Sequence, residues 1–128
     1  MIVLDTHAWL WWVDAPAQLS RSARGVIDSA EVIGVSAMSA LEVATLVRKG
    51  RLALDRPAAE WIRAALAQPR VRELAITADI AVRAGSFGPE FHADPADRVI
   101  AATALVLGAP LVTKDEALRK MPMLQPVW

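Results

Sequence analysis

Four carboxylates stand at points of the chain where an α/β domain collects its chemistry: Asp5, Glu42, Asp97 and Asp115. Asp5 directly follows a short apolar run, and Asp115 lies just after another. Glu42 and Asp97 each fall in the first turn of an expected helix. Carboxylate oxygens are hard ligands, and several of them without cysteine favour Mg²⁺ or Mn²⁺ over zinc or copper. A metal ion held in this way can activate water and stabilise the charge that builds on a phosphodiester.

The elements that must position these acids follow from apolar runs, helical periodicity and capping residues. We expect strands at 2–4, 32–35, 71–76 and 111–113, and a last edge strand near 126–128. We expect helices at 6–13, 20–30, 38–49, 57–67, 77–84, 95–107 and 116–120. Strands that alternate with helices predict an α/β fold whose mostly parallel central sheet is flanked by helices on both faces. Ligands of such sheets bind at the carboxyl ends of the strands, where all four acids are expected.

Helix capping is the competing explanation for each acid taken singly. The segment 39–42 fits a capping box that ends in Glu42. Asp94 fits an N-cap followed by proline, which places Asp97 at the third helical position. The other two acids could cap the helices that follow them. Capping explains the four acids less well when they are taken together, because carboxylates at one edge raise one another's pKa unless a cation neutralises them.

Composition limits the class of protein. The 128 residues suit a single domain, and 55% hydrophobic residues supply a core. Fourteen basic and fourteen acidic residues cancel, so charge neither indicates nor excludes a nucleic-acid partner. The absence of cysteine excludes disulfides, thiol nucleophiles and zinc–thiolate sites. With no basic region before the first apolar run and no apolar stretch of about 20 residues, we expect a cytoplasmic protein without a membrane span.

Four sequence blocks carry the acids in order along the chain. They are Leu4-Asp5-Thr6-His7, Ser39-Ala40-Leu41-Glu42-Val43-Ala44, Asp94-Pro95-Ala96-Asp97-Arg98 with the apolar residues after it, and Leu111-Val112-Thr113-Lys114-Asp115. In order and spacing these blocks resemble the acidic blocks of PIN-domain nucleases, most of all the VapC-type toxins of bacterial VapBC toxin–antitoxin pairs. The resemblance covers essentially the whole chain.

The resemblance implies a three-layer PIN-like fold and the toxin of a type II toxin–antitoxin system. Such a toxin would be a Mg²⁺- or Mn²⁺-dependent endoribonuclease that hydrolyses RNA phosphodiesters through metal-activated water. The resemblance carries Asp5 and Asp97 over as the firmest metal ligands, with Glu42 and Asp115 completing the site directly or through water. It also implies an RNA substrate, a homodimer and a cognate antitoxin protein.

Several residues beside the four acids have two possible roles each. Thr6 and Thr113 could orient carboxylates by hydrogen bonds, or cap helices. Arg98 and Lys114 could meet RNA phosphates, or balance the local negative charge. His7 lies near Asp5, but two histidines without cysteine do not make a zinc site.

The sequence leaves open the roles of Asp94 and His92, and those of three tryptophans. Asp94 could be a fifth acid of the site rather than only an N-cap, and His92 could contact substrate or transfer a proton rather than lie on a surface loop. Trp9, Trp11 and Trp12 cannot all face one side of a helix, so at least one is expected at an exposed surface or an interface. There it could stack on RNA bases or bind another protein.

Two other functions compete with the nuclease. An aspartate-nucleophile phosphatase would use Asp5, but such enzymes usually carry a second acid two residues on, where this chain has His7. A non-enzymatic, receiver-like or partner-binding module would use the acids as caps and the tryptophans as its binding face. Receivers usually pair acids just after the first strand, and that pair is missing here.

Overall fold

The central sheet is built from five parallel strands. The computed structural model describes residues 1–91 and 94–128, so the hypothesis on His92 lies outside the described residues. Within them the strand order is β3-β2-β1-β4-β5, and each neighbouring pair is parallel. The strands are β1 (Ile2–Leu4), β2 (Ile33–Ser36), β3 (Val71–Leu74), β4 (Leu111–Val112) and β5 (Pro126–Val127). The predicted α/β fold with a parallel sheet is confirmed.

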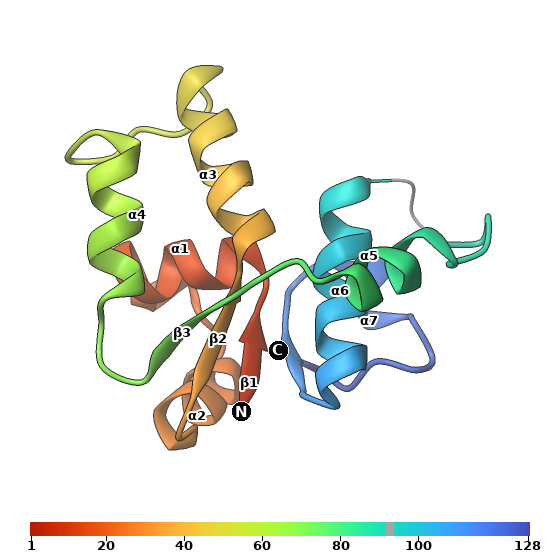
Figure 1. Cartoon of the computed structure of the whole chain (residues 1–128). Coiled ribbons are helices and arrows are strands. Elements are labelled where there is room, and N and C mark those ends of the chain that lie inside the picture. The colour runs from red at the N-terminus through yellow and green to blue at the C-terminus, as the bar shows by residue number, and fades with distance from the viewer. Residues whose placement is uncertain (92–93) are drawn as a thin grey trace.

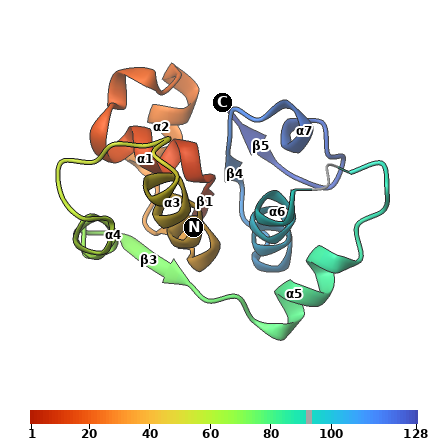
Figure 2. The same cartoon turned by 90° about the horizontal axis from the view of Figure 1, so that it is seen from above.

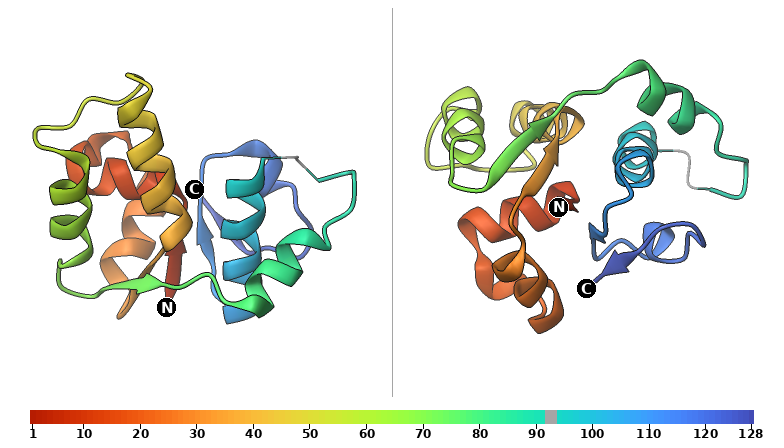
Figure 3. Two further views of the ribbon diagram at one scale, coloured as in Figure 1. Left: turned by 45° about the horizontal axis from the view of Figure 1, so that its top comes forward. Right: turned by 60° about the horizontal axis from the view of Figure 1, so that its bottom comes forward.

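Helices cover both faces of this sheet. They are α1 (Thr6–Asp14), α2 (Arg21–Ser29), α3 (Ala37–Arg48), α4 (Ala58–Leu66), α5 (Ala78–Gly85), α6 (Pro95–Leu107) and α7 (Glu116–Arg119), with a 3-10 turn η1 (Pro16–Gln18). Helices α1 to α4 lie on one side of β1 and β4, and helices α5 to α7 lie on the other (Figures 1, 2 and 3). None of the helices in the described ranges is long and apolar enough to cross a membrane.

The alternation of side chains along the strands divides the core into two clusters. Ile2 and Leu4 pack into one cluster with residues of α1, α2 and α4. Val3, between them, points to the opposite face and packs into a second cluster with Leu111 and with Ile100 of α6. Because both faces of the central strands are buried, β1 has no polar residue until Asp5.

Most helix ends lie where their capping residues predict. The side chains of Ser20 and Thr77 accept hydrogen bonds from backbone N–H groups in the first turns of α2 and α5. Gly108 ends α6 with a left-handed backbone, φ 61°, which a glycine adopts without strain. Helix α6 packs against α5, α3 and β1, as its apolar sequence predicts.

The start of α3 differs from the prediction. Ser36, the last residue of β2, caps this helix by accepting a hydrogen bond from the Met38 N–H at 3.0 Å. Glu42 therefore lies in the second turn of α3, so both its expected place in the first turn and the capping-box explanation are wrong. Ser39, the expected cap, is a fully buried helical residue.

Two other boundaries move for local reasons. Strand β3 ends at Leu74 rather than at residue 76, because its partner β2 ends at Ser36, the residue paired with Leu74. Pro57 precedes α4 instead of opening it, since its ψ of 143° is extended.

Candidate metal centre

The chain delivers the four predicted acids to the carboxyl edge of the sheet from four different elements. Asp5 follows β1 and Asp115 follows β4, and each is the N-cap of the next helix. Asp97 is the third residue of α6, which runs opposite to the strands and so begins at the same edge (Figure 1). Glu42 lies one turn further along α3 than expected. An acid can therefore cap a helix and also contribute to a site, because the helix that follows a strand begins at the carboxyl edge of the sheet.

Asp5 is a buried carboxylate held at both oxygens. Its side chain belongs to a residue only 4% exposed. The Thr6 N–H donates to Oδ1 at 2.8 Å, and the Thr113 hydroxyl donates to Oδ2 at 2.7 Å. Burial raises the pKa of Asp5 above its ordinary value, while these two hydrogen bonds and the nearby His7 oppose that rise. The hydrogen bonds fix the orientation of the carboxylate within the buried site.

Glu42 is connected to Asp5 through Thr6. The Thr6 hydroxyl donates to Oε1 of Glu42 and is also hydrogen-bonded to the buried Ser39 hydroxyl, at 2.9 Å. Burial raises the pKa of Glu42, the Thr6 hydrogen bond lowers it, and the charges of Asp5 and Asp94 raise it again. Ser39 and Glu42, three positions apart on α3, share the helix face that meets Thr6. The sequence reading missed Ser39 as a positioning group, although this spacing was the available signal.

The pKa of Asp97 responds to the charges of the other acids. Its pKa is raised to about 7, first by burial and then by the charges of four other carboxylates. These are Asp5, Asp94, Asp115 and Glu42. Nearby negative charges disfavour the charged form of a carboxyl group, so each of these four carboxylates raises the pKa of Asp97. The four predicted acids and Asp94 therefore share one electrostatic field at this edge of the sheet.

Asp115 and Asp94 each cap a helix, and the charge of each also raises the pKa of Asp97. Oδ1 of Asp115 accepts a hydrogen bond from the Leu118 N–H at 3.0 Å, and its own N–H donates to Thr113 Oγ1 at 3.0 Å. Oδ1 of Asp94 accepts from the Ala96 N–H at 2.9 Å. Asp94 thus acts as the predicted N-cap and at the same time raises the pKa of two acids of the site.

The donor set fits a hard divalent cation with water in its coordination sphere. Within residues 1–91 and 94–128, no group of three or more histidine, cysteine or acidic side chains stands close enough together to hold a metal ion. Mg²⁺ does not need such a group, since it keeps several waters and is commonly held by one or two carboxylates. Asp5 is held in orientation by two hydrogen bonds, and Asp97 lies in the field of four other carboxylates.

A hollow of about 360 Å³ opens beside these acids and is lined by Asp5, His7, Trp11, Lys114 and Asp115. Lys114 is exposed there, with Nζ 5.6 Å from the centre of the Trp11 ring. Arg98, expected to meet RNA phosphates or to balance the local negative charge, is hydrogen-bonded at the end of α5. It donates to the backbone oxygens of Phe87 at 3.0 Å and Ala84 at 3.4 Å, and so holds the end of α5.

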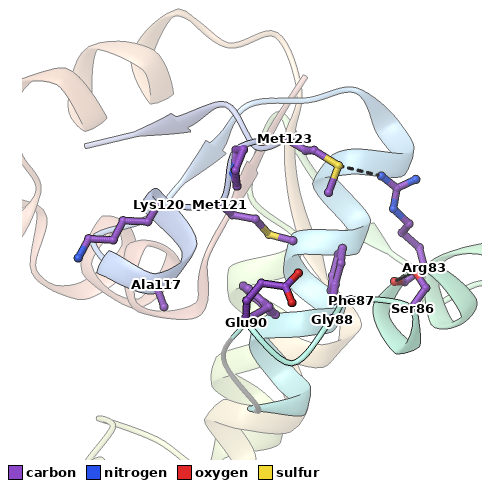
Figure 4. A pocket seen from close by; sticks show the side chains of 11 residues that line it. Arg83, Ser86, Phe87, Gly88, Glu90, Ala117, Lys120, Met121 and Met123 are labelled. Carbon is purple, nitrogen blue, oxygen red and sulfur yellow. Dashed lines mark hydrogen bonds between the residues drawn. The ribbon is translucent and has the colours of Figure 1, made fainter.

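A larger hollow, of about 540 Å³, lies between the end of α5 and α7 (Figure 4). Its lining includes Phe87, Phe91 and Met121, and Arg83 donates to the sulfur of Met123 at 3.6 Å. Glu90 is the carboxylate in its lining, and none of the four predicted acids contributes. The smaller hollow, by contrast, is lined by two of the four predicted acids, Asp5 and Asp115.

The three tryptophans of α1 have separate environments. Trp9 is fully buried and meets the Trp61 ring edge-on, with centroids 5.1 Å apart. Trp12 is half-buried against the same core cluster. Trp11 is half-buried too, but it borders the hollow and contacts His7 and Trp128. One of the three therefore stands beside the candidate site, and Trp128 is an aromatic neighbour that the sequence alone did not indicate.

The sheet order, the acids at its carboxyl edge and the sequence blocks that carry them define a known class of domain. The PIN domain family matches residues 2–124, and this chain belongs to that family. It is 39% identical over 126 residues to Ribonuclease VapC22 of Mycobacterium tuberculosis, covering 98% of this chain and 95% of the relative. The resemblance to VapC-type proteins drawn from the sequence is confirmed.

Solved structures share the fold over the same length. VapC20 of M. tuberculosis, described as a sarcin-ricin loop cleaving toxin, matches with a TM-score of 0.72 at 20% identity and 98% coverage of both chains. VapBC2 of Rickettsia felis, bound to a DNA fragment from the promoter, matches with a TM-score of 0.72 at 18% identity, covering 98% of this chain and 97% of the other. At these identities the two structures support the three-layer PIN-like fold.

Proposed function

We propose that this chain is a metal-dependent endoribonuclease and the toxin of a type II toxin–antitoxin pair. The observation that carries the proposal is the placement of Asp5, Glu42, Asp97 and Asp115 at one edge of the parallel sheet, where Asp5 is buried and held by Thr6 and Thr113. Such an arrangement is unfavourable by itself and becomes favourable when a divalent cation neutralises it. The 39% identity to a protein named Ribonuclease VapC22 supports the choice of RNA as substrate.

The bound Mg²⁺ or Mn²⁺ would activate a water molecule and stabilise the negative charge that builds on the phosphodiester. Asp5 and Asp97 would hold the ion, and Glu42 and Asp115 would complete the site directly or through water. Thr113 and Thr6 keep the carboxylates of Asp5 and Glu42 in place by their hydrogen bonds. Hydrolysis joins the water oxygen to phosphorus, and the ribose oxygen that leaves takes up a proton.

The test is cleavage of RNA by the purified protein with and without Mg²⁺ or Mn²⁺. Asp5→Asn and Asp97→Asn should abolish cleavage while the circular dichroism spectrum stays that of the parent. Asp28→Asn is the matched control, because Asp28 is exposed on α2, which lies near the amino ends of the strands and away from the carboxyl edge of the sheet (Figure 1). Full activity in both site variants, or cleavage that is unchanged in EDTA, contradicts the proposal.

The toxin role and the assembly need their own tests. Several solved structures that share the fold are complexes of a toxin with its antitoxin, for example one from Klebsiella pneumoniae. We propose a cognate antitoxin, a homodimer and a cytoplasmic location for this chain as well. Induced expression should arrest growth, the Asp97→Asn variant should not, and sedimentation should give twice the mass of the chain. Normal growth under induction of an active, soluble protein would contradict the toxin role.

A further inference from the structure

Two hollows meet at a pair of tryptophan rings beside the candidate metal centre. The first is the hollow of about 360 Å³ that Asp5, Trp11 and Lys114 help to line. The second, of about 450 Å³, is lined by Glu116, Arg119, Lys120, Pro126 and Trp128. The Trp11 and Trp128 rings have centroids 5.7 Å apart, so one aromatic wall borders both hollows. We call the surface formed by His7, Trp11, Lys114, Arg119 and Trp128 the tryptophan track.

The tryptophan rings of the track are partly exposed, and Lys114 lies over one of them, the Trp11 ring. Trp11 and Trp128 are half-buried and are tilted by 53° to one another, so neither covers the other face to face. The exposed His7 ring lies 5.8 Å from Trp11 and extends the aromatic surface toward Asp5. Aromatic side chains that border a groove bind unstacked bases, because every base has a π-face.

The charges along the track suit a polyanion. Lys114 and Arg119 are exposed, and Lys114 stands over the Trp11 ring at 5.6 Å. Lys120 is 3.9 Å from Glu116, and both side chains are 80% exposed, so this pair is largely screened by solvent. Lys114 and Arg119 are thus two exposed cations beside the aromatic rings, on a surface that also carries Asp115 and Glu116.

We propose that the tryptophan track binds the nucleotides of a single-stranded RNA segment next to the scissile phosphate. Bases lie against Trp11 and Trp128, and backbone phosphates contact Lys114 and Arg119. The inference rests on the proposed function, because the cleaved phosphate would sit at the acids. The track is continuous with that site, since Lys114 directly precedes Asp115 and Arg119 lies on the helix that Asp115 caps. Paired bases in a duplex cannot turn their faces to these rings, so the track selects unpaired RNA.

Binding of a short labelled RNA to the Asp97→Asn protein in EDTA tests the proposal without cleavage. Trp128→Leu should weaken binding about ten-fold, and Trp128→Phe should retain most of the affinity. Arg119→Gln should lower the slope of log affinity against log salt by about 0.7, the value for one phosphate contact with a single strand. Arg63→Gln is the control, because Arg63 is exposed on α4, which packs at the β3 edge of the sheet, whereas α7 packs at the opposite, β5 edge (Figure 1). A duplex should bind parent and Trp128→Leu proteins equally weakly.

Trp128 also packs against the core, so its variants must be shown to unfold at the parent's temperature. Arg119 is exposed, so Arg119→Gln keeps the test valid even if Trp128→Leu fails to fold. Unchanged RNA affinity in Trp128→Leu, or an unchanged salt slope in Arg119→Gln, overturns the proposal. So does failure of the Asp97→Asn parent to bind single-stranded RNA.

The same variants in the active protein separate this inference from the proposed function. Trp128→Leu should raise KM for single-stranded RNA while kcat stays near that of the parent. If the parent cleaves RNA and the track variants keep its KM, the nuclease stands and the track proposal falls. If the parent cleaves no RNA, the proposed function falls first. If RNA binding is unchanged but neutralisation by the antitoxin is lost, the track binds protein and the RNA assignment is wrong.

Discussion

Thr113 donates a hydrogen bond of 2.7 Å to Asp5 across a separation of 108 residues. The same Thr113 oxygen accepts the N–H of Asp115, so one hydroxyl connects the acid after β1 to the acid after β4. The connection depends on the direct pairing of these two strands, in which Leu4 stands opposite Val112. The orientation of the buried acid therefore depends on strand pairing in the sheet as well as on the neighbouring N–H of Thr6.

Replacing Thr113 tests how much this hydrogen bond contributes. Thr113→Val keeps the shape and leaves Oδ2 of Asp5 without its donor, which raises the pKa of Asp5 further. We expect the affinity for Mn²⁺ and the cleavage rate to fall about 10- to 100-fold, as for other groups that orient metal ligands. Thr113→Ser restores the hydroxyl and should behave like the parent. Equal losses in the Val and Ser variants, measured by calorimetry and kinetics, would assign the effect to packing.

Asp97 should make the metal-free protein less stable as the pH rises. Its folded pKa of about 7 lies above the ordinary value of 3.8. The folded chain thus keeps a proton that the unfolded chain has lost, and its stability falls between about pH 4 and about pH 7. Asp97→Asn should raise the Tm of the metal-free protein at pH 8 by a few degrees, roughly 1 kcal/mol after allowance for solvent screening.

The matching measurement is the Tm in EDTA and in Mg²⁺ at pH 6 and pH 8. Metal binding competes with the proton, so Mg²⁺ should raise the Tm of the parent more at pH 8 than at pH 6. Burial also raises the pKa of Asp5 and Glu42, so the variant should keep part of the pH dependence. A variant that is less stable than the parent in EDTA at pH 8 would refute electrostatic repulsion at this position.

Glu42 and Asp5 should differ in importance for metal binding. Glu42→Gln keeps an acceptor for the Thr6 hydroxyl and removes one charge at a half-buried position. We expect it to weaken Mn²⁺ binding about ten-fold, the lower end of the range for supporting groups, whereas Asp5→Asn should abolish it. Titration calorimetry of both variants measures the difference. Equal affinities in the two would remove the distinction between the firm and the supporting ligands.

Trp9 and Trp12 should differ in their effect on stability. Trp9 is fully buried against Trp61, and Trp9→Leu leaves a cavity that costs about 3 kcal/mol of unfolding free energy. Trp12 is only half-buried, so Trp12→Leu should cost about 1 kcal/mol. Urea unfolding of the two variants gives both values. Similar costs would mean that burial does not separate the roles of these two residues.

The sequence alone determined the elements and the edge at which the acids gather. The buried strand β1 ends at the first polar residue after three apolar ones, and α6 begins at Asp94-Pro95, where capping predicts it. These features are local, because a run of apolar residues or a cap reports the burial and the hydrogen bonds of its own segment. The PIN family match agrees with that reading.

Only the tertiary structure decided which side chains meet. The position of Glu42 along α3 depends on whether Ser36 or Ser39 caps this helix. The cap is Ser36, the last residue of the buried strand β2. The contact of Trp11 with Trp128 and the hydrogen bond from Thr113 to Asp5 each join the two ends of the chain. Periodicity gives the face of an element but not its partner. The partner is set by how the parallel strands pair and how the helices dock on them, which depends on contacts far apart in sequence.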